Sequence, residues 1–364
     1  KKPMPTYDLL DSLRKSGRQR IARRLIDLKE GLRAEIPVKT LDNLLLATWN
    51  IREFDSGSFG KRSDEAILYI AEIIDHFDLV AVQEVRDDLE GLYRLKEVLG
   101  RWWDVIFTDV TEGTAGNNER MAFLFDSRKV RFGGLSGEVV LPEAKDEQGI
   151  LRPVRQLVRT PMMVGFKAGW YEFVLVTVHL IYGEAKADPD DRVREAELLS
   201  NFLAKRADDP TAWSKNMVLL GDFNIFKPEN RTFEKIAANF YIPEALQKLP
   251  SNIPQNKHYD QIAFRSPFVN DFRQKIESGK IKVHAGVYNY FEQVYSVKDE
   301  RLKTYQNEMG KAYLVNSAGK ARTEEEKSNY YKTFWRTHQM SDHLPMWIEI
   351  PINRSLQYLQ DLLK

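Results

Sequence analysis

An aspartate and an asparagine follow directly on an apolar run in the middle of the chain. Met217 to Leu220 are apolar and predict a buried strand, after which we expect the chain to turn at Gly221. Side chains two positions apart in extended backbone point to the same side, so Asp222 and Asn224 should face one site. A carboxylate beside a carboxamide suits a hard metal ion, an attacking water or a phosphate oxygen. A strand followed by an Asx turn, without any functional site, also explains the same residues.

Polar residues recur at the ends of other predicted strands. Because the loops at one end of a sandwich converge, we expect these side chains to share a site. Taken singly, each acid could cap a turn, and each histidine could be a core residue with its hydrogen bonds satisfied. Together they offer oxygen ligands for a magnesium-like ion and two imidazoles that can transfer protons near neutral pH, with neighbouring acids that favour the charged imidazole. The residues are Asn50, Glu84, His179, Asp222, Asn224, Asp260, Asp342 and His343.

Composition excludes several kinds of chemistry. The chain of 364 residues has no cysteine, so disulfides, thiolate metal sites and cysteine nucleophiles are impossible. The histidines are not grouped as a zinc site requires, and neither a serine elbow nor a Walker loop is present. No apolar run reaches membrane-spanning length. Absence of disulfides fits a reducing compartment, so we expect a cytoplasmic protein, although the N-terminus lacks methionine and processing could have removed a targeting segment.

Length and charge predict three parts. Residues 1–40 hold 11 lysines and arginines against 5 acidic residues, which is +6 in a chain of net charge +1. Their leucine spacing predicts a basic helical extension that Gly17 interrupts. It is either an arm that touches phosphates or a helical hairpin packed on the body with a solvated basic face, which we favour; it could equally bind a protein partner. Residues 41–350 form the main domain with an insertion at about 297–332, and residues 351–364 form a short helix expected to pack on the body.

Strand runs and covering helices alternate within the main domain. Repeated strand–strand pairs argue against a purely doubly wound parallel sheet. We therefore predict an α/β (α+β) fold in which two packed mixed β-sheets are flanked by helices, a four-layer sandwich. The predicted strands are 44–49, 79–82, 120–125, 130–132, 164–166, 172–179, 217–220, 259–264, 281–284 and 341–350, and the clearest helices are 63–76 and 190–206.

The polar residues and their neighbours, in this order, resemble the endonuclease/exonuclease/phosphatase superfamily, and within it the deoxyribonuclease I branch. The likeness covers residues 43–296 and 338–350. The groove-inserting tyrosine of that branch has no counterpart, because Asn117 and Asn118 stand there. The motifs that carry the resemblance are Thr48-Trp49-Asn50-Ile51-Arg52, Gln83-Glu84-Val85-Arg86-Asp87, Glu119-Arg120, Thr177-Val178-His179, Gly221-Asp222-Phe223-Asn224, Tyr259-Asp260 and Ser341-Asp342-His343-Leu344-Pro345.

The resemblance implies cleavage of phosphodiesters in double-stranded DNA with Mg²⁺, which Mn²⁺ can replace. Glu119 would orient His179 and Asp260 would orient His343, so that one imidazole takes a proton from water and the other protonates the leaving oxygen. By the same resemblance the catalytic residues are His179, His343, Asp222, Asn224, Glu119, Asp260 and Asp342; the metal ligands are Asn50, Glu84 and Asp342; and the phosphate or DNA contacts are Arg52, Arg86, Arg159 and Asn224.

Two other functions stay open. The first is a phosphatase or phospholipase of the same superfamily that acts on inositol phosphates or sphingolipid. Tyr259-Asp260-Gln261-Ile262 and the lack of a clear apolar membrane-docking loop argue mildly against it. The second is a nucleic-acid or protein binding module that has lost catalysis, which the complete set of site residues disfavours.

Overall fold

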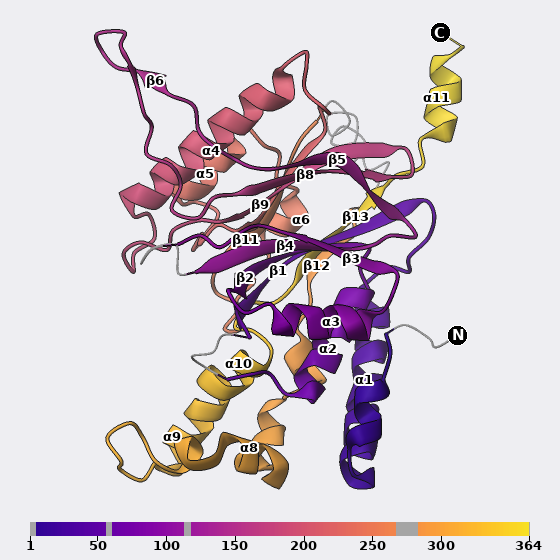
Figure 1. Ribbon diagram of the computed structural model, residues 1–364, viewed down its shortest axis with the longest axis vertical. Coiled ribbons are helices and arrows are strands. Elements are labelled where there is room, and N and C mark those ends of the chain that lie inside the picture. The colour runs from indigo at the N-terminus through magenta and orange to yellow at the C-terminus, as the bar shows by residue number, and fades with distance from the viewer. Residues whose placement is uncertain (1–4, 56–59, 113–117, 267–282, 364) are drawn as a thin grey trace.

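The computed structural model describes residues 5–55, 60–112, 118–266 and 283–363 of the chain. Two β-sheets lie face to face in the middle of the molecule, and helices cover the outer side of each (Figure 1). The predicted fold of two packed mixed sheets flanked by helices is therefore confirmed.

One sheet has six strands with β1 near its centre. β13 pairs with β1 in antiparallel fashion on one side, and β2 pairs with it in parallel on the other. Because β1 and β2 are parallel, their C-terminal ends meet at one edge of the sheet. The strand order is β12 (Ala285–Val287), β13 (Met346–Pro351), β1 (Asn43–Phe54), β2 (Leu79–Arg86), β4 (Glu119–Asp126) and β3 (Trp103–Phe107).

The other sheet has five strands and also contains one parallel pair, β9 with β10. A separate two-stranded hairpin, β6 (Ala144–Lys145) with β7 (Leu151–Arg152), projects from the sandwich (Figure 1). The strand order of the five-stranded sheet is β11 (Asp260–Arg265), β10 (Met217–Asp222), β9 (Tyr171–His179), β8 (Met162–Ala168) and β5 (Val130–Glu138).

Helices cover the outer faces of both sheets. The predicted helix at 63–76 is present as α2, and Ser63 is its N-cap, with a side chain that accepts a hydrogen bond from the Ala66 amide. The six-stranded sheet is covered by α1 (Lys15–Glu35), α2 (Asp64–Asp75) and α3 (Glu90–Leu99), and the five-stranded sheet by α4 (Asp190–Asp208) and α5 (Arg231–Ala237). Shorter helices are η1 (Asp8–Ser12), α6 (Glu244–Gln247) and η2 (Tyr290–Glu292).

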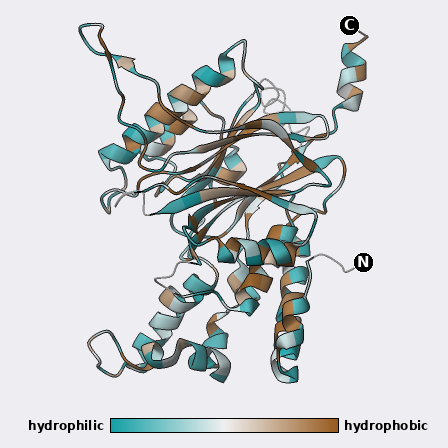
Figure 2. Ribbon diagram, viewed as in Figure 1, coloured by the Kyte–Doolittle hydropathy of each residue, from teal (hydrophilic) through white to brown (hydrophobic). Residues whose placement is uncertain are grey.

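Alternation along β1 explains the layers. Leu44 and Leu46 pack into the apolar cluster between the two sheets, whereas Leu45, Ala47 and Trp49 pack into a second cluster beneath the helices. This two-residue period is that of a strand buried on both faces. Figure 2 shows apolar segments along the strands of both sheets and in bands on the helices.

The N-terminal extension packs on the body through α1. The helix runs through Gly17 without a break, so the predicted interruption is wrong. Ile21, Leu25, Leu28 and Leu32 are its buried stripe, and they join the cluster beneath the six-stranded sheet. The spacing of these four residues is that of one helical face, so the packed alternative describes the extension better than a free arm.

Residues 297–332 are largely helical, and with the residues up to 339 they form what we call the helical lobe. Tyr305 and Tyr331 are buried in it. The Tyr305 hydroxyl and the Arg20 guanidinium both donate to Glu65 Oε1 at 2.5 and 2.5 Å, which ties the lobe to α1 and α2. A second ion pair, Arg24 with Asp299, joins α1 to the lobe. The elements of the lobe are η3 (Val297–Arg301), α8 (Lys303–Leu314), α9 (Glu324–Asn329), η4 (Tyr330–Trp335) and α10 (Arg336–Gln339).

The C-terminal helix α11 (Ser355–Asp361) extends away from the sandwich (Figure 1). We expected it to pack on the body through its leucines, but these side chains are all more than half exposed; they are Leu356, Leu359, Leu362 and Leu363. Its contact with the body is made by Tyr358, whose ring lies 5.5 Å from that of Trp170. Among the described residues, no helix combines the length and apolar character needed to cross a bilayer.

Several predicted strand ends differ from the structure. β1 continues to Phe54, well past the expected end. β13 begins at Met346, because the residues from Ser341 onward form a turn that carries polar side chains instead of a strand. Of the predicted strand 281–284, residues 281 and 282 lie outside the described residues, and the strand β12 begins at Ala285.

Candidate active site

The ends of β9, β10 and β11 bring a histidine and two aspartates together. Asp222, the last residue of β10, pairs in register with His179 of β9 on one side and with Asp260 of β11 on the other. Neighbouring strands are about 4.8 Å apart, so these side chains lie at one edge of the five-stranded sheet. The expected turn at Gly221 is wrong, because the strand continues through it to Asp222.

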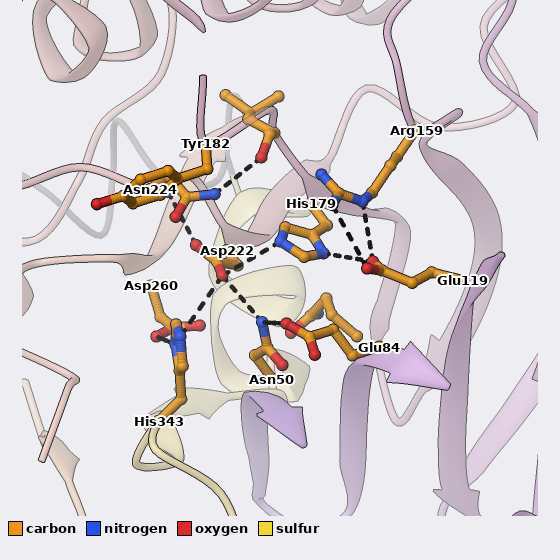
Figure 3. Close-up of polar contacts among 12 residues, drawn as sticks. Asn50, Glu84, Glu119, Arg159, His179, Tyr182, Asp222, Asn224, Asp260 and His343 are labelled. Carbon is orange, nitrogen blue, oxygen red and sulfur yellow. Dashed lines mark hydrogen bonds and ion pairs between the residues drawn. The ribbon is translucent and has the colours of Figure 1, made fainter. Parts of the chain in front are cut away.

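Two histidine–carboxylate pairs join the sheets (Figure 3). His179 Nδ1 lies 2.8 Å from Glu119 Oε2, and His343 Nδ1 lies 2.8 Å from Asp260 Oδ2. His179 and Asp260 belong to the five-stranded sheet, whereas Glu119 begins β4 and His343 precedes β13 of the six-stranded sheet. All four residues are buried. Each pair therefore crosses the seam between the two sheets.

Asp222 lies between the two imidazoles. Its Oδ2 is 3.6 Å from His179 Nε2 and 3.7 Å from His343 Nε2. The same oxygen accepts a hydrogen bond from Asn50 Nδ2 at 2.9 Å. When Nδ1 of an imidazole is bonded to an acid, Nε2 is the atom left for proton transfer. One buried carboxylate thus faces both of the atoms that can move a proton.

Asn224 is fixed by backbone contacts on both sides. Its backbone N–H donates to Asp222 Oδ1 at 2.8 Å, and its side-chain Nδ2 donates to Leu180 O at 2.8 Å. Its φ of 54° is left-handed, a conformation that a residue other than glycine keeps only when its surroundings hold it. Gly221, at φ 134°, leaves no room for a side chain, because a Cβ there would lie 2.1 Å from Val178 O. The close approach of β9 to β10 at this glycine is what places Asp222 beside His179.

Two further residues of the site, Asn50 and Glu84, lie near the C-terminal ends of β1 and β2. Asn50 Nδ2 donates to Glu84 Oε1 at 2.8 Å, and the Glu53 amide donates to Glu84 Oε2 at 2.8 Å. Glu84 has a left-handed φ of 62°. Asn50 Oδ1 is buried and has no hydrogen-bond partner among the described residues. A buried amide oxygen without a donor, beside a carboxylate, suits a hard divalent ion.

The charges around Glu84 also fit a cation. Burial, and next the negative charge of Glu119, raise the pKa of Glu84, and a bound cation would favour the ionised carboxylate. Two groups of three residues each place possible ligand atoms within 4.8 Å of one another: Glu84 with Glu119 and His179, and Asp222 with Asp260 and His343. The carboxylate oxygens of these groups suit a hard divalent ion, whereas imidazole nitrogens are not the ligands that Mg²⁺ prefers.

A cavity of about 350 Å³ opens in front of these side chains. Arg52 and Asp342 line it and lie 3.7 Å apart, measured from Arg52 Nη1 to Asp342 Oδ2. Arg159 also lines it, with its Nε 2.9 Å from Glu119 Oε2. Arg86, which the sequence suggested as a phosphate contact, is not among the lining residues and instead points to Glu53 and Glu119, at 3.4 and 3.8 Å.

Opposing effects act on the two imidazoles. Burial lowers the pKa of His179, as does the charge of Arg159, but the carboxylates of Glu119 and Asp222 outweigh both and raise it. For His343, burial again lowers the pKa, while Asp260 and Asp222 raise it well above its ordinary value. Both histidines therefore favour the charged form, as expected from their neighbouring acids.

Several supporting contacts could not be predicted from the sequence, although most of the residues that make them stand in the motifs. Gln83 Nε2 donates to Thr48 Oγ1 at 3.1 Å and to Thr177 Oγ1 at 2.8 Å, which links the two sheets beneath the site. Ser251 Oγ donates to Asp260 Oδ2 at 2.6 Å from a loop without any motif. Ser341 Oγ donates to Asn50 O at 2.7 Å. These contacts depend on the register between distant segments, which residue spacing does not reveal.

Comparisons with known proteins agree with this architecture. No family model matches the chain, and no curated protein does. A solved structure of an endonuclease/exonuclease/phosphatase family protein from Bacteroides thetaiotaomicron does match: the alignment covers 85% of this chain and 98% of that one, with 18% identity and a TM-score of 0.50. The chain has the endonuclease/exonuclease/phosphatase fold. The resemblance seen in the sequence is thereby confirmed at the level of the fold.

Two further structures of this fold are similar to the chain. A mannosyl-6-phosphatase from the same bacterium is 18% identical, with 84% of this chain and 99% of that chain covered and a TM-score of 0.49. The catalytic domain of human Nocturnin, solved with a bound sulfate, is 14% identical, with 84% and 93% covered and a TM-score of 0.48. In the endonuclease/exonuclease/phosphatase fold of this chain, the cavity lies where the parallel strands of both sheets end.

Proposed function

We propose that this protein is a divalent-metal-dependent phosphodiesterase that hydrolyses DNA internally, as a deoxyribonuclease I-like endonuclease does. The convergence of two histidine–carboxylate pairs on one buried aspartate, Asp222, carries the proposal. A single general acid or base would need one such pair. Two pairs facing one cavity suit a displacement in which one proton leaves the attacking water and another reaches the leaving oxygen.

The carboxylates fix the tautomer of each imidazole. Glu119 and Asp260 accept from Nδ1 of His179 and His343, which leaves both Nε2 atoms directed toward Asp222. A neutral imidazole in this tautomer accepts a proton at Nε2, and a charged one donates from it. In the proposed reaction one histidine acts in each state, and Asp222 and Asn224 orient the water and the scissile phosphate.

Asn50 and Glu84 would hold Mg²⁺ or Mn²⁺, with Asp342 as a further oxygen donor at the rim of the cavity. A bound divalent ion would supply Lewis-acid stabilisation of the charge that develops on the phosphate oxygens. Arg52 and Arg159, which line the cavity, would add positive charge against the same oxygens. Arg86 would act indirectly, by fixing Glu119.

The test is incubation of the purified protein with supercoiled plasmid, with Mg²⁺ or Mn²⁺ and with chelator. We expect nicking that requires the metal and that falls by at least about 100-fold in His179→Ala and in His343→Ala. His284→Ala is the matched control: His284 is also paired with a glutamate, Glu349, at 2.6 Å, but it does not line the cavity. Unchanged nicking by His179→Ala would remove its assigned role.

A panel of substrates decides between the remaining functions. Parallel reactions with inositol phosphates and sphingomyelin test a phosphatase or phospholipase. Turnover of those substrates without any nicking would replace DNA as the substrate while keeping the metal and the histidines. Absence of turnover on every substrate, in the presence of either metal, would point to a binding module instead.

A further inference from the structure

A row of aromatic rings begins at His343, and its first and last members face the cavity. The Tyr259 ring stacks on the His343 imidazole at 5.3 Å, with an interplanar angle of 27°. Phe226 meets Tyr259 edge to face at 5.9 Å, and Tyr182 lies 6.1 Å from Phe226. Tyr182 and Tyr259 line the cavity, and Tyr182 is 40% exposed. We call Tyr182, Phe226 and Tyr259 the aromatic wall.

Two cations lie over this wall. Lys257 Nζ is 3.4 Å from the centre of the Phe226 ring, and the guanidinium carbon of Arg192 is 5.3 Å from the same centre. Arg192 is fully buried, and its Nη1 donates to Tyr182 O at 2.9 Å. Arg192 therefore both adds charge behind the rings and fixes the backbone that presents Tyr182. Buried groups therefore contact both ends of the wall: Arg192 at the Tyr182 backbone and His343 at the Tyr259 ring.

The three rings differ in how accessible they are to a ligand. Tyr259 is committed on one face to the His343 imidazole. Phe226 is committed to the cations and to its two neighbours. Tyr182 is the most exposed member and stands at the rim of the cavity. A ligand that reaches past the phosphate position would therefore meet the Tyr182 ring.

The chemistry of the wall selects a flat, partly apolar group that is attached to an anion. Aromatic rings flanked by cations are how nucleic-acid-binding proteins hold bases while neutralising the phosphates between them. A base inside a duplex is already stacked on its neighbours, so only an unstacked base can lie on a protein ring. A cavity of about 350 Å³ has the volume of a small-molecule site, enough for a phosphate with one neighbouring group.

We propose that Tyr182 is a stacking subsite for an unpaired nucleobase next to the scissile phosphate, and that the substrate is consequently nucleic acid with a single-stranded or frayed segment. This inference rests on the proposed phosphodiesterase function and refines its substrate. It assigns Tyr182 to substrate positioning and not to proton transfer. Stacking requires the ring and not the hydroxyl, which makes the two parts of the side chain separately testable.

The test compares two labelled strands of equal length and charge. One is a single-stranded oligothymidylate, and the other carries abasic tetrahydrofuran at every position, so that it keeps the sugars and phosphates but has no bases. Binding is measured in chelator by fluorescence anisotropy, and cleavage is measured separately with Mg²⁺. We expect the wild-type protein to bind the base-bearing strand about 5- to 150-fold more tightly, the range for loss of one base–aromatic contact.

Three variants assign the preference to the ring. Tyr182→Ala should abolish it, and Tyr182→Phe should keep it. Tyr358→Ala should leave it unchanged, because Tyr358 is an exposed residue of α11 whose ring contacts Trp170, just before β9, and does not line the cavity. In cleavage, the loss in Tyr182→Ala should be mainly in KM.

Two results would overturn the subsite: equal binding of both strands by the wild-type protein, or a preference that survives in Tyr182→Ala. Base-dependent binding that requires Tyr182 but is never followed by cleavage of any phosphodiester would support the subsite and reject the proposed function. The two ideas therefore fail separately.

Discussion

Glu119 serves three charged partners at once. Its carboxylate lies 2.8 Å from His179 Nδ1, 2.9 Å from Arg159 Nε and 3.8 Å from Arg86 Nη1. The two arginines counterbalance the carboxylate, while the carboxylate raises the pKa of the imidazole against the effect of burial. A residue placed in this way positions a catalytic group without touching the reacting atoms itself, so its loss should change the titration of that group as well as the rate.

Glu119→Gln should keep the shape of the site and remove its charge. Burial and Arg159 would then lower the pKa of His179, so the imidazolium would be lost at a lower pH than in the wild-type protein. We expect kcat to fall by about 100-fold or more with little change in KM, and the limb of the pH–rate profile that belongs to His179 to move toward acid. Glu349→Gln, in the pair with His284, is the matched control. An unmoved limb would refute the positioning role.

Gly221 should tolerate no side chain. Alanine there would place Cβ 2.1 Å from Val178 O at a φ of 134°, so β9 and β10 would have to separate. We expect Gly221→Ala to lower the free energy of unfolding by about 3 kcal/mol or more, as read from urea titration. Gly137→Ala on β5 has open space around the new Cβ and should change it by less than about 1 kcal/mol. Similar losses in both variants would contradict this explanation.

At the scale of elements, α1 connects the body to the helical lobe through packing and ion pairs. Its apolar stripe is part of the core, and Arg20, Arg24 and Lys29 are paired with Glu65, Asp299 and Glu72. Deleting the extension would therefore expose core residues and destabilise the protein. Binding by the basic face is better tested with exposed side chains that make no such pair.

Lys15→Gln combined with Arg23→Gln makes that test, because both residues are exposed. Since we favour a solvated basic face, we expect the dependence of DNA affinity on salt to match that of the wild-type protein. The control pair is Lys205→Gln with Arg206→Gln on α4, which is also exposed. Each lost phosphate contact would flatten the slope of log K against log salt by about 0.9, so a flattening confined to the α1 pair would instead establish the arm as a DNA contact.

Sequence spacing predicted elements better than it predicted contacts between them. The apolar run of β1 and the helix that begins after Ser63 are local properties, and both were predictable. The polar residues at strand ends were also visible, because they interrupt apolar runs. The contact of Ser251 with Asp260 and the turning of Arg86 toward Glu53 were not, because each depends on how separate segments meet in space. The exposed leucines of α11 show the same limit: their spacing predicts a helical face but not what covers it.

At the scale of the whole molecule, ligand binding and stability are coupled through the site. A cation held by Asn50 and Glu84 would stabilise only the folded protein, since these residues come together from β1 and β2. Binding at 100 times the dissociation constant adds about 2.7 kcal/mol to the free energy of unfolding. Metal addition should therefore be visible without any substrate.

We expect Mg²⁺ or Mn²⁺ to raise the Tm of the wild-type protein by a few degrees, measured by thermal unfolding against a chelator-treated sample. Glu84→Gln should show little or no rise, because it loses the charged ligand. Glu349→Gln should respond like the wild-type protein, because Glu349 does not line the cavity. An equal rise in Glu84→Gln would place the cation elsewhere.

Because both histidine–carboxylate pairs cross the seam, neither half of the sandwich contains a complete proton-transfer unit. A nascent or partly melted chain with only one sheet formed would have its acids and imidazoles unmatched, and so would lack the arrangement on which the proposed hydrolysis depends. Hydrolytic competence would then appear only at the last stage of assembly, when the two sheets close on each other.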